Sequence, residues 1–131
     1  MANDKKSYKI VGEINKELAQ TAEFEYYGEV YMSPGVIKHI MKKHKNNLED
    51  YVTNNIIDYI KLIIRKPDFV GKHPKKVGTS IELVKKIEQN LLLAIDVDLD
   101  EHYIYVASLY PITEAKLISR ISSGRVKKFK K

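Results

Sequence analysis

The feature that most constrains the fold is a change in apolar spacing about halfway along the chain. Between residues 36 and 64 apolar side chains recur every three or four positions, as in an amphipathic helix. From residue 80 to 110 they alternate with polar ones or form short apolar blocks, as in β-strands. This order predicts an α+β fold, with N-terminal helices packed on one face of a C-terminal antiparallel sheet of about four strands. The other face of that sheet is then open to a ligand.

Local signals mark the ends of these elements. Ser33 followed by Pro34 predicts a helix start, and that helix runs to about Lys45. A second helix is predicted over residues 49–66, where Pro67 ends it. The remaining predicted elements are strands at 9–14, 28–32, 80–88, 91–98 and 103–110, and helices at 15–23 and 113–121.

The length and composition fit one domain over residues 1–131, with frayed ends expected at 1–8 and 125–131. The chain has no cysteine, which excludes a disulfide framework, a zinc ribbon and thiol catalysis. No apolar run is long enough to span a membrane, and the first residues lack a signal-peptide core. We therefore expect a cytoplasmic protein with no membrane partner.

The chain is strongly basic, with a formal net charge of +6 and a pI of about 9.3. Basic small domains often bind polyanions, because each lysine placed on a phosphate releases counterions. Most of the excess is lysine, which contacts phosphate as a point charge, so backbone contact is favoured over base readout. The equally weighted alternative is that lysine only keeps the surface soluble.

Two histidines share the first predicted helix. His39 and His44 lie five residues apart, which is about 140° around the axis and wrong for two ligands of one metal. We therefore expect neither a metal nor another cofactor. His44 lies four residues from both Ile40 and Leu48, beside the buried stripe. An imidazole in the position of His44 either has a structural hydrogen-bond partner or faces a cleft. His39, considered alone, is an ordinary surface residue.

Polar residues in the second half are the other candidates. Lys85 shares a predicted strand face with Ile81 and Leu83, so it is either an edge lysine reaching solvent or a cation on the open face. Ser108 and Tyr110 are predicted to share a face with Ile104 and Val106, and their hydroxyls suit phosphate binding. Residues 71–79 form a predicted basic loop whose Lys72, His73 and Lys75 could contact an anion, although a solvated loop is the slightly favoured alternative. Lys43 and Arg120 are further candidates for contact with phosphate, and each could equally be an ordinary surface residue.

The ordered set of motifs resembles the barnase/EndoU/colicin-tRNase/RelE (BECR) ribonuclease superfamily, in particular its phage- and prophage-associated branch. The resemblance covers residues 28–124 and leaves the first 27 uncovered. It rests on VYMSPGVIKHIMKKH, then IIRKPDFVG, and then the strands IELVKKIE, LLLAIDVD and YIYVASLYP. It implies metal-independent RNA cleavage and a toxin-like role. It also points to His39, His44, Lys85, Ser108 and Tyr110 as the site.

The chemistry of these side chains agrees with that implication. RNA cleavage without a metal needs a base for the 2′-hydroxyl, an acid for the 5′-oxygen and a cation for the phosphorane. We expect His44 as the main acid or base, His39 as its partner or a phosphate ligand, and Lys85 as the cation. The product would carry a 2′,3′-cyclic phosphate. The expected partners are tRNA or other cellular RNA and a neutralising antitoxin or immunity protein. The alternatives are a non-catalytic RNA-binding module and a protein-interaction domain.

Overall fold

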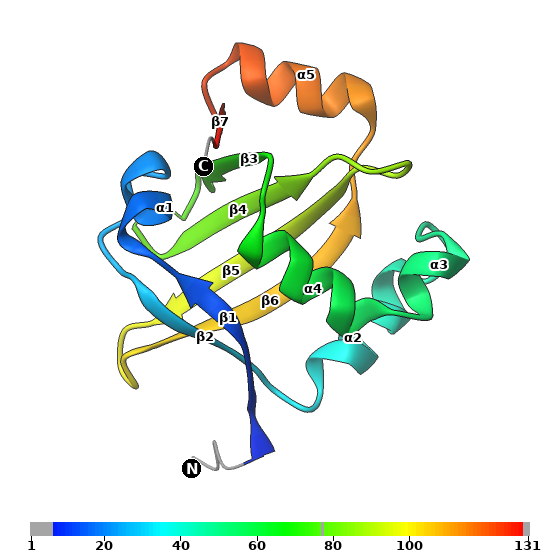
Figure 1. The fold of residues 1–131 in the computed structure, drawn as a ribbon, viewed down its shortest axis with the longest axis horizontal. Coiled ribbons are helices and arrows are strands. Elements are labelled where there is room, and N and C mark those ends of the chain that lie inside the picture. The colour runs from blue at the N-terminus through cyan, green and yellow to red at the C-terminus, as the bar shows by residue number, and fades with distance from the viewer. Residues whose placement is uncertain (1–6, 77, 130–131) are drawn as a thin grey trace.

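The computed structural model describes residues 7–76 and 78–129, which form one seven-stranded sheet and five helices (Figure 1). In chain order the elements are β1 (Lys9–Ile14), α1 (Lys16–Thr21), β2 (Gly28–Met32), α2 (Val36–His44), α3 (Asp50–Thr53), α4 (Ile56–Arg65), β3 (Phe69–Lys72), β4 (Ser80–Lys85), β5 (Leu91–Asp98), β6 (Tyr103–Pro111), α5 (Glu114–Ser122) and β7 (Val126–Lys128).

The sheet is mixed and larger than the sequence pattern predicts. Its strand order is β1-β2-β6-β5-β4-β3-β7, and the β2–β6 pair is parallel while the other neighbours are antiparallel. The expectation of N-terminal helices on one face of a C-terminal antiparallel sheet of about four strands is therefore wrong. Strands β1 and β2 come from the N-terminal half, and β3 and β7 come from segments too short to show alternation over several residues. In addition, α5 follows the long strands.

The two faces of the sheet have different coverings. Ile81, Leu83 and Ile95 belong to the main core with residues of α1, α2 and α4, and we call their side the helix face. The opposite side, the open face, carries Glu82 and Ala94. Among the described residues, α5 covers one end of the open face, where it packs through a smaller apolar cluster of Val84, Leu92, Ile112, Leu117 and Val126. Figure 1 shows α5 at the far end of β6, away from α2 and α4.

A β-bulge in β6 decides which side chains reach the open face. Ser108 pairs with Ala94, whereas Val106 pairs with Ile95, so Ala107 is the extra residue. Ser108 and Tyr110 therefore lie on the open face with Ala94. Ile104 and Val106 are buried on the helix face, so the expectation that all four share one face is wrong.

The segment predicted as one helix over 49–66 is divided into α3 and α4. Asn55 interrupts it with φ −143° and ψ 39°, and its side-chain amide donates to the Tyr51 carbonyl at 2.9 Å. Short polar side chains that bond to the backbone compete with helical hydrogen bonds, which explains the break. The preceding helix also begins later than predicted, at Val36, because Ser33 and Pro34 lie in a turn before it.

The chain ends in a strap, residues 123–129, which carries β7 along the edge of β3. The strap fits because Gly71 has no side chain: a Cβ there would lie 1.9 Å from the Arg125 carbonyl oxygen. The Glu23 carboxylate pairs with both Lys72 and Lys127 and so joins the strap to the turn after α1. Of the ends expected to be frayed, 1–6 and 130–131 lie outside the described residues.

We predict that Gly12→Ala destabilises the fold by about 1–3 kcal/mol, the usual cost of overpacking. A Cβ at Gly12 would lie 2.6 Å from Ile64 Cγ2, where α4 crosses β1. Urea unfolding followed by circular dichroism measures the change. The control is Gly35→Ala, where a Cβ meets nothing within 4 Å. Equal midpoints for the two variants would contradict the close approach of α4 to β1.

Candidate nucleic-acid site

His44 and Tyr110 meet at an edge of the sheet. Strand β2 pairs with β6 only at Ile104 and Tyr105, so the rest of that edge is left to α2, which packs against β6. His44 is the last residue of α2 and Tyr110 lies near the end of β6. Their ring centroids are 5.2 Å apart with an interplanar angle of 30°. An imidazole from the helical half therefore lies against a phenol from the sheet.

Both rings line a cavity with a volume of about 810 Å³. Its other walls are the turn between β4 and β5 and the turn leading into α5. The Glu114 carboxylate at its rim accepts from Asn90 and pairs with Lys86 at 3.3 Å. A space of this size is typical of sites that bind small molecules or single nucleotides.

The surroundings of His44 favour its neutral form. Partial burial lowers its pKa below the ordinary value of 6.5, and the positive charges of Lys43 and His39 lower it further. The imidazole is then mostly unprotonated at neutral pH. His44 is therefore suited to accept a proton.

Tyr110 is shifted in the opposite sense. Burial raises the pKa of its phenol above 10, and the negative charge of Glu82 adds to this, while Arg120 and Arg125 act against it. The hydroxyl keeps its proton at neutral pH and is a hydrogen-bond donor. The two contacting rings thus offer one acceptor and one donor.

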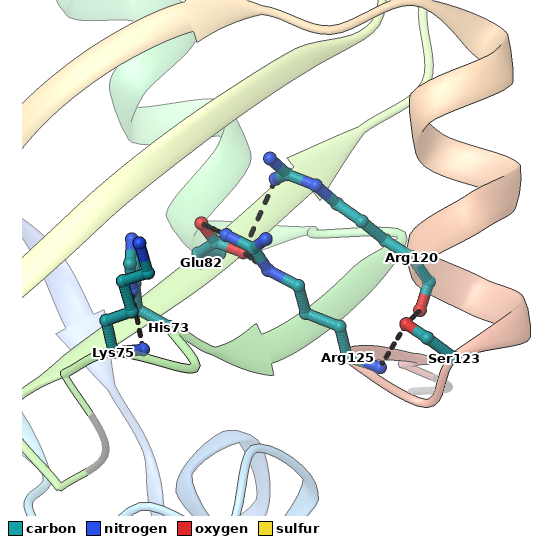
Figure 2. A network of polar contacts seen from close by, with 6 residues as sticks. All are labelled: His73, Lys75, Glu82, Arg120, Ser123 and Arg125. Atoms are coloured by element: carbon teal, nitrogen blue, oxygen red, sulfur yellow. Dashed lines mark hydrogen bonds and ion pairs between the residues drawn. The ribbon is translucent and has the colours of Figure 1, made fainter.

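A buried carboxylate with two arginines lies on the same face of the sheet. Glu82 of β4 is 1% exposed and accepts from Arg125 Nε at 2.9 Å and Arg125 Nη2 at 2.7 Å. Arg120 of α5 donates to the same carboxylate at 3.4 Å. Figure 2 shows both guanidinium groups reaching toward Glu82, one from α5 and one from the strap. The group carries two positive charges against one negative charge.

Ser108 is placed near these residues by the bulge. It lies opposite Ala94, which in turn pairs with Glu82, and it is two residues before Tyr110. Its Oγ is buried and has no hydrogen-bond partner among residues 7–76 and 78–129. A buried hydroxyl without a partner is uncommon, so this oxygen has bonding capacity to spare.

His39 lies on the same helix as His44 but lines another cavity. It is exposed, and its cavity of about 440 Å³ also includes Asp96 and Tyr105. Five residues of helix separate the two histidines by about 7.5 Å along the axis. The structure therefore places them at neighbouring positions along β6 and not in one cavity.

Lys85 is on the other side of the sheet from Ser108 and Tyr110. It lies on the helix face, where its amine donates to the Lys66 carbonyl at 2.8 Å and pairs with Asp68 at 3.6 Å. These contacts bind the end of α4, where helical carbonyls lack partners. The structure therefore does not bring Lys85 together with the other predicted site residues.

The residues predicted to contact RNA are spread over the surface. Lys43 is exposed at the end of α2, beside His44. Lys72 pairs with Glu23 at 3.0 Å, so its charge is partly used within the fold. In the loop after β3, His73 Nδ1 accepts from the backbone of Lys75, as Figure 2 shows. Of this set, Arg120 alone contacts the Glu82 network.

Two residues of the site were not found from the sequence. Glu82 occupies a predicted strand face with Val84, and a charged residue within a buried strand was the signal that could have found it. Arg125 was expected to lie in the frayed C-terminal end, residues 125–131. Its role depends on the strap folding back along β3, which no local pattern indicates.

Within the described ranges, no group of three or more His, Asp or Glu side chains is arranged to hold a metal ion. None of the described helices is long and apolar enough to cross a membrane.

Comparison with known families identifies the chain. Residues 9–119 match the family described as phage-Barnase-EndoU-ColicinE5/D-RelE like nuclease 3. Since the match covers most of the chain, the protein belongs to this nuclease family, and its substrate is a nucleic acid. This confirms the resemblance seen in the sequence. No curated protein and no solved structure matches the chain.

We predict that Lys43→Gln raises the pKa of His44, because the substitution removes one of the charges that oppose imidazole protonation. An NMR titration of the His44 ring protons measures the change. Lys61→Gln on α4 is the matched control and should leave the titration where it is. An unchanged His44 pKa in Lys43→Gln would contradict a contribution of the Lys43 charge to the shift.

Proposed function

We propose that this protein is a metal-independent endoribonuclease that cleaves RNA by attack of the 2′-hydroxyl and leaves a 2′,3′-cyclic phosphate. The observation that carries the proposal is the contact between His44 and Tyr110 in an open cavity. Their opposite pKa shifts supply a proton acceptor and a donor at neutral pH.

The proposed reaction assigns one task to each group. His44 takes the proton from the 2′-hydroxyl, and the 2′-oxygen then attacks phosphorus to form the cyclic ester. The Tyr110 hydroxyl donates to a non-bridging oxygen, with the buried Ser108 hydroxyl two residues before it helping to position the phosphate, while the positive charge of Arg120 stabilises the phosphorane. The bond to the 5′-oxygen breaks, and that oxygen takes the proton that His44 has accepted, while His39 in the neighbouring cavity acts as a ligand of an adjoining phosphate. The products are a 2′,3′-cyclic phosphate and a free 5′-hydroxyl.

The biological setting is part of the same proposal. An RNase acting on tRNA or other cellular RNA works in the cytoplasm and harms the cell that holds it. A toxin-like role then requires a neutralising antitoxin or immunity protein. With a net charge of +6 on the enzyme, the fitting inhibitor surface is acidic.

The reaction is tested by incubating the protein with tRNA and with total RNA in the presence of EDTA. We expect fragments with 2′,3′-cyclic phosphate and 5′-hydroxyl ends. Intact RNA with retained binding at high protein concentration would favour the non-catalytic module. Failure to bind RNA even at low salt would favour a protein-interaction domain.

We predict that His44→Ala lowers kcat/KM by about 10²–10⁴-fold, the usual contribution of a general base. The melting temperature should change little, because His44 lies at the end of α2 and is only half-buried. The control is His102→Asn, since His102 lies in a turn with φ 59°, a conformation that asparagine tolerates. Ordinary activity together with a large loss of stability would make His44 structural.

We also predict the pH dependence of the cleavage. A general base works only when unprotonated, so kcat/KM should fall as pH decreases through the pKa of His44. Because that pKa is lowered, the midpoint of the acidic limb should lie below pH 6.5. Initial rates in EDTA across pH 4.5–8 measure it. A midpoint above 6.5 would contradict this assignment.

A further inference from the structure

We propose that the C-terminal strap completes the site: Arg125 joins Arg120 in a two-arginine clamp for an RNA phosphate, and Glu82 is the positioning residue that orients both. This inference rests on the proposed function, because it assumes an RNA phosphate at Tyr110. It adds two residues and one segment to the site.

The geometry of the Glu82 network suits a clamp. Arg125 presents its Nε–Nη2 edge to the carboxylate, with bonds of 2.9 and 2.7 Å, so its Nη1 is turned away from Glu82. Arg120 makes one longer contact of 3.4 Å to Glu82 Oε1. Both side chains are largely buried, with 18% and 24% exposed, so their positions are fixed before a ligand arrives. Guanidinium groups held in this way bind phosphate through planar pairs of N–H donors.

The charge of the network exceeds what a structural ion pair requires. One buried carboxylate is neutralised by one guanidinium, and Arg125 already bonds to Glu82 through two nitrogens. The second guanidinium leaves a surplus positive charge on the open face. Arg120 and Arg125 both influence the Tyr110 hydroxyl, so the surplus charge lies beside the proposed reaction centre.

The strap holds Arg125 in place by its backbone. Gly124 turns the chain after α5 with φ 81°, and Val126 then pairs with Gly71. The Phe129 amide donates to the Asp68 carbonyl at 2.9 Å, and Lys127 pairs with Glu23. The family match ends at residue 119, so both arginines come from the part of this chain that follows it.

The clamp is tested by binding of a single-stranded RNA whose 2′-hydroxyls are methylated, so that cleavage cannot occur. Fluorescence anisotropy is measured at several salt concentrations for wild type, Arg125→Gln, Arg125→Lys and Arg65→Gln. Arg65 is the matched control, because it is the remaining arginine and belongs to α4, on the helix face.

We expect Arg125→Gln to weaken binding by about 10- to 100-fold, the range for a charge-assisted bond, and to reduce the salt slope by about one. Arg125→Lys should recover the salt slope but not the affinity, because lysine keeps the charge and loses the planar fork. Arg65→Gln should match wild type. Equal losses in Arg65→Gln and Arg125→Gln would overturn the clamp, since they would reflect net charge alone.

Glu82→Gln separates a positioning role from a purely structural one. Removing the carboxylate adds net positive charge, so RNA affinity should be kept or increased, while kcat falls at least tenfold because the arginines lose their orientation. If Glu82→Gln unfolds, affinity and kcat cannot be compared in that variant. Arg125→Lys then decides the question: a reduced kcat in a protein that keeps the wild-type melting temperature supports the positioning role. Unchanged kcat in a folded Glu82→Gln protein would overturn the positioning role.

The two proposals fail in different ways. Arginine-dependent binding of the methylated RNA, without cleavage of unmodified RNA, would support the clamp and contradict the nuclease mechanism. Cleavage with unchanged affinity, salt slope and kcat in Arg125→Gln would support the mechanism and overturn the clamp.

Discussion

The buried carboxylate of Glu82 is the constraint on which the open face of the sheet depends. An ionised group in the middle of β4, 1% exposed, is costly unless charged donors surround it. The donors come from two segments about forty residues later, α5 and the strap. Compensation of one buried charge thus ties the C-terminal segment to the centre of the sheet. It also gathers positive charge where a polyanion would bind.

The two faces of the sheet differ in what covers them. The helix face holds the main core with α1, α2 and α4, where isoleucines of α4 and the strands exclude water. The open face has only a small cluster under α5, so its remaining area is available to polar side chains. The bulge at Ala107 then assigns Ser108 and Tyr110 to the open face. One extra residue in a strand therefore decides where two hydroxyls point.

The position of His44 depends on how short β2 is. Had β2 continued along β6, it would have occupied the edge where α2 now lies. Because the pairing ends after two residues, the end of α2 reaches Tyr110, and the imidazole becomes partly buried. Burial and neighbouring positive charge both lower its pKa. The short pairing of β2 with β6 thus leaves room for the imidazole that accepts a proton in the proposed reaction.

Local sequence patterns predicted several elements well. A helix was expected from residue 15, and the Asn15 side chain caps it by accepting from the Leu18 amide at 2.8 Å. Thr113 likewise caps α5, with a bond of 3.1 Å to the Lys116 amide. The long strands β5 and β6 were predicted almost to their ends, because a run of alternating or apolar residues carries its own signal. The family resemblance was also visible in the order of these segments.

Local sequence patterns were enough to predict the separate elements, the basic charge and the presence of histidine and hydroxyl groups in the right segments. Tertiary structure alone decided the seven-stranded sheet, the face on which each side chain lies and the partners of Glu82. Lys85 shows the limit, because its spacing with Ile81 and Leu83 predicted their shared face correctly but not which face the helices cover. The physical reason is that periodicity fixes relative orientation within one strand, whereas bulges, strand order and long-range ion pairs depend on residues far away in the chain.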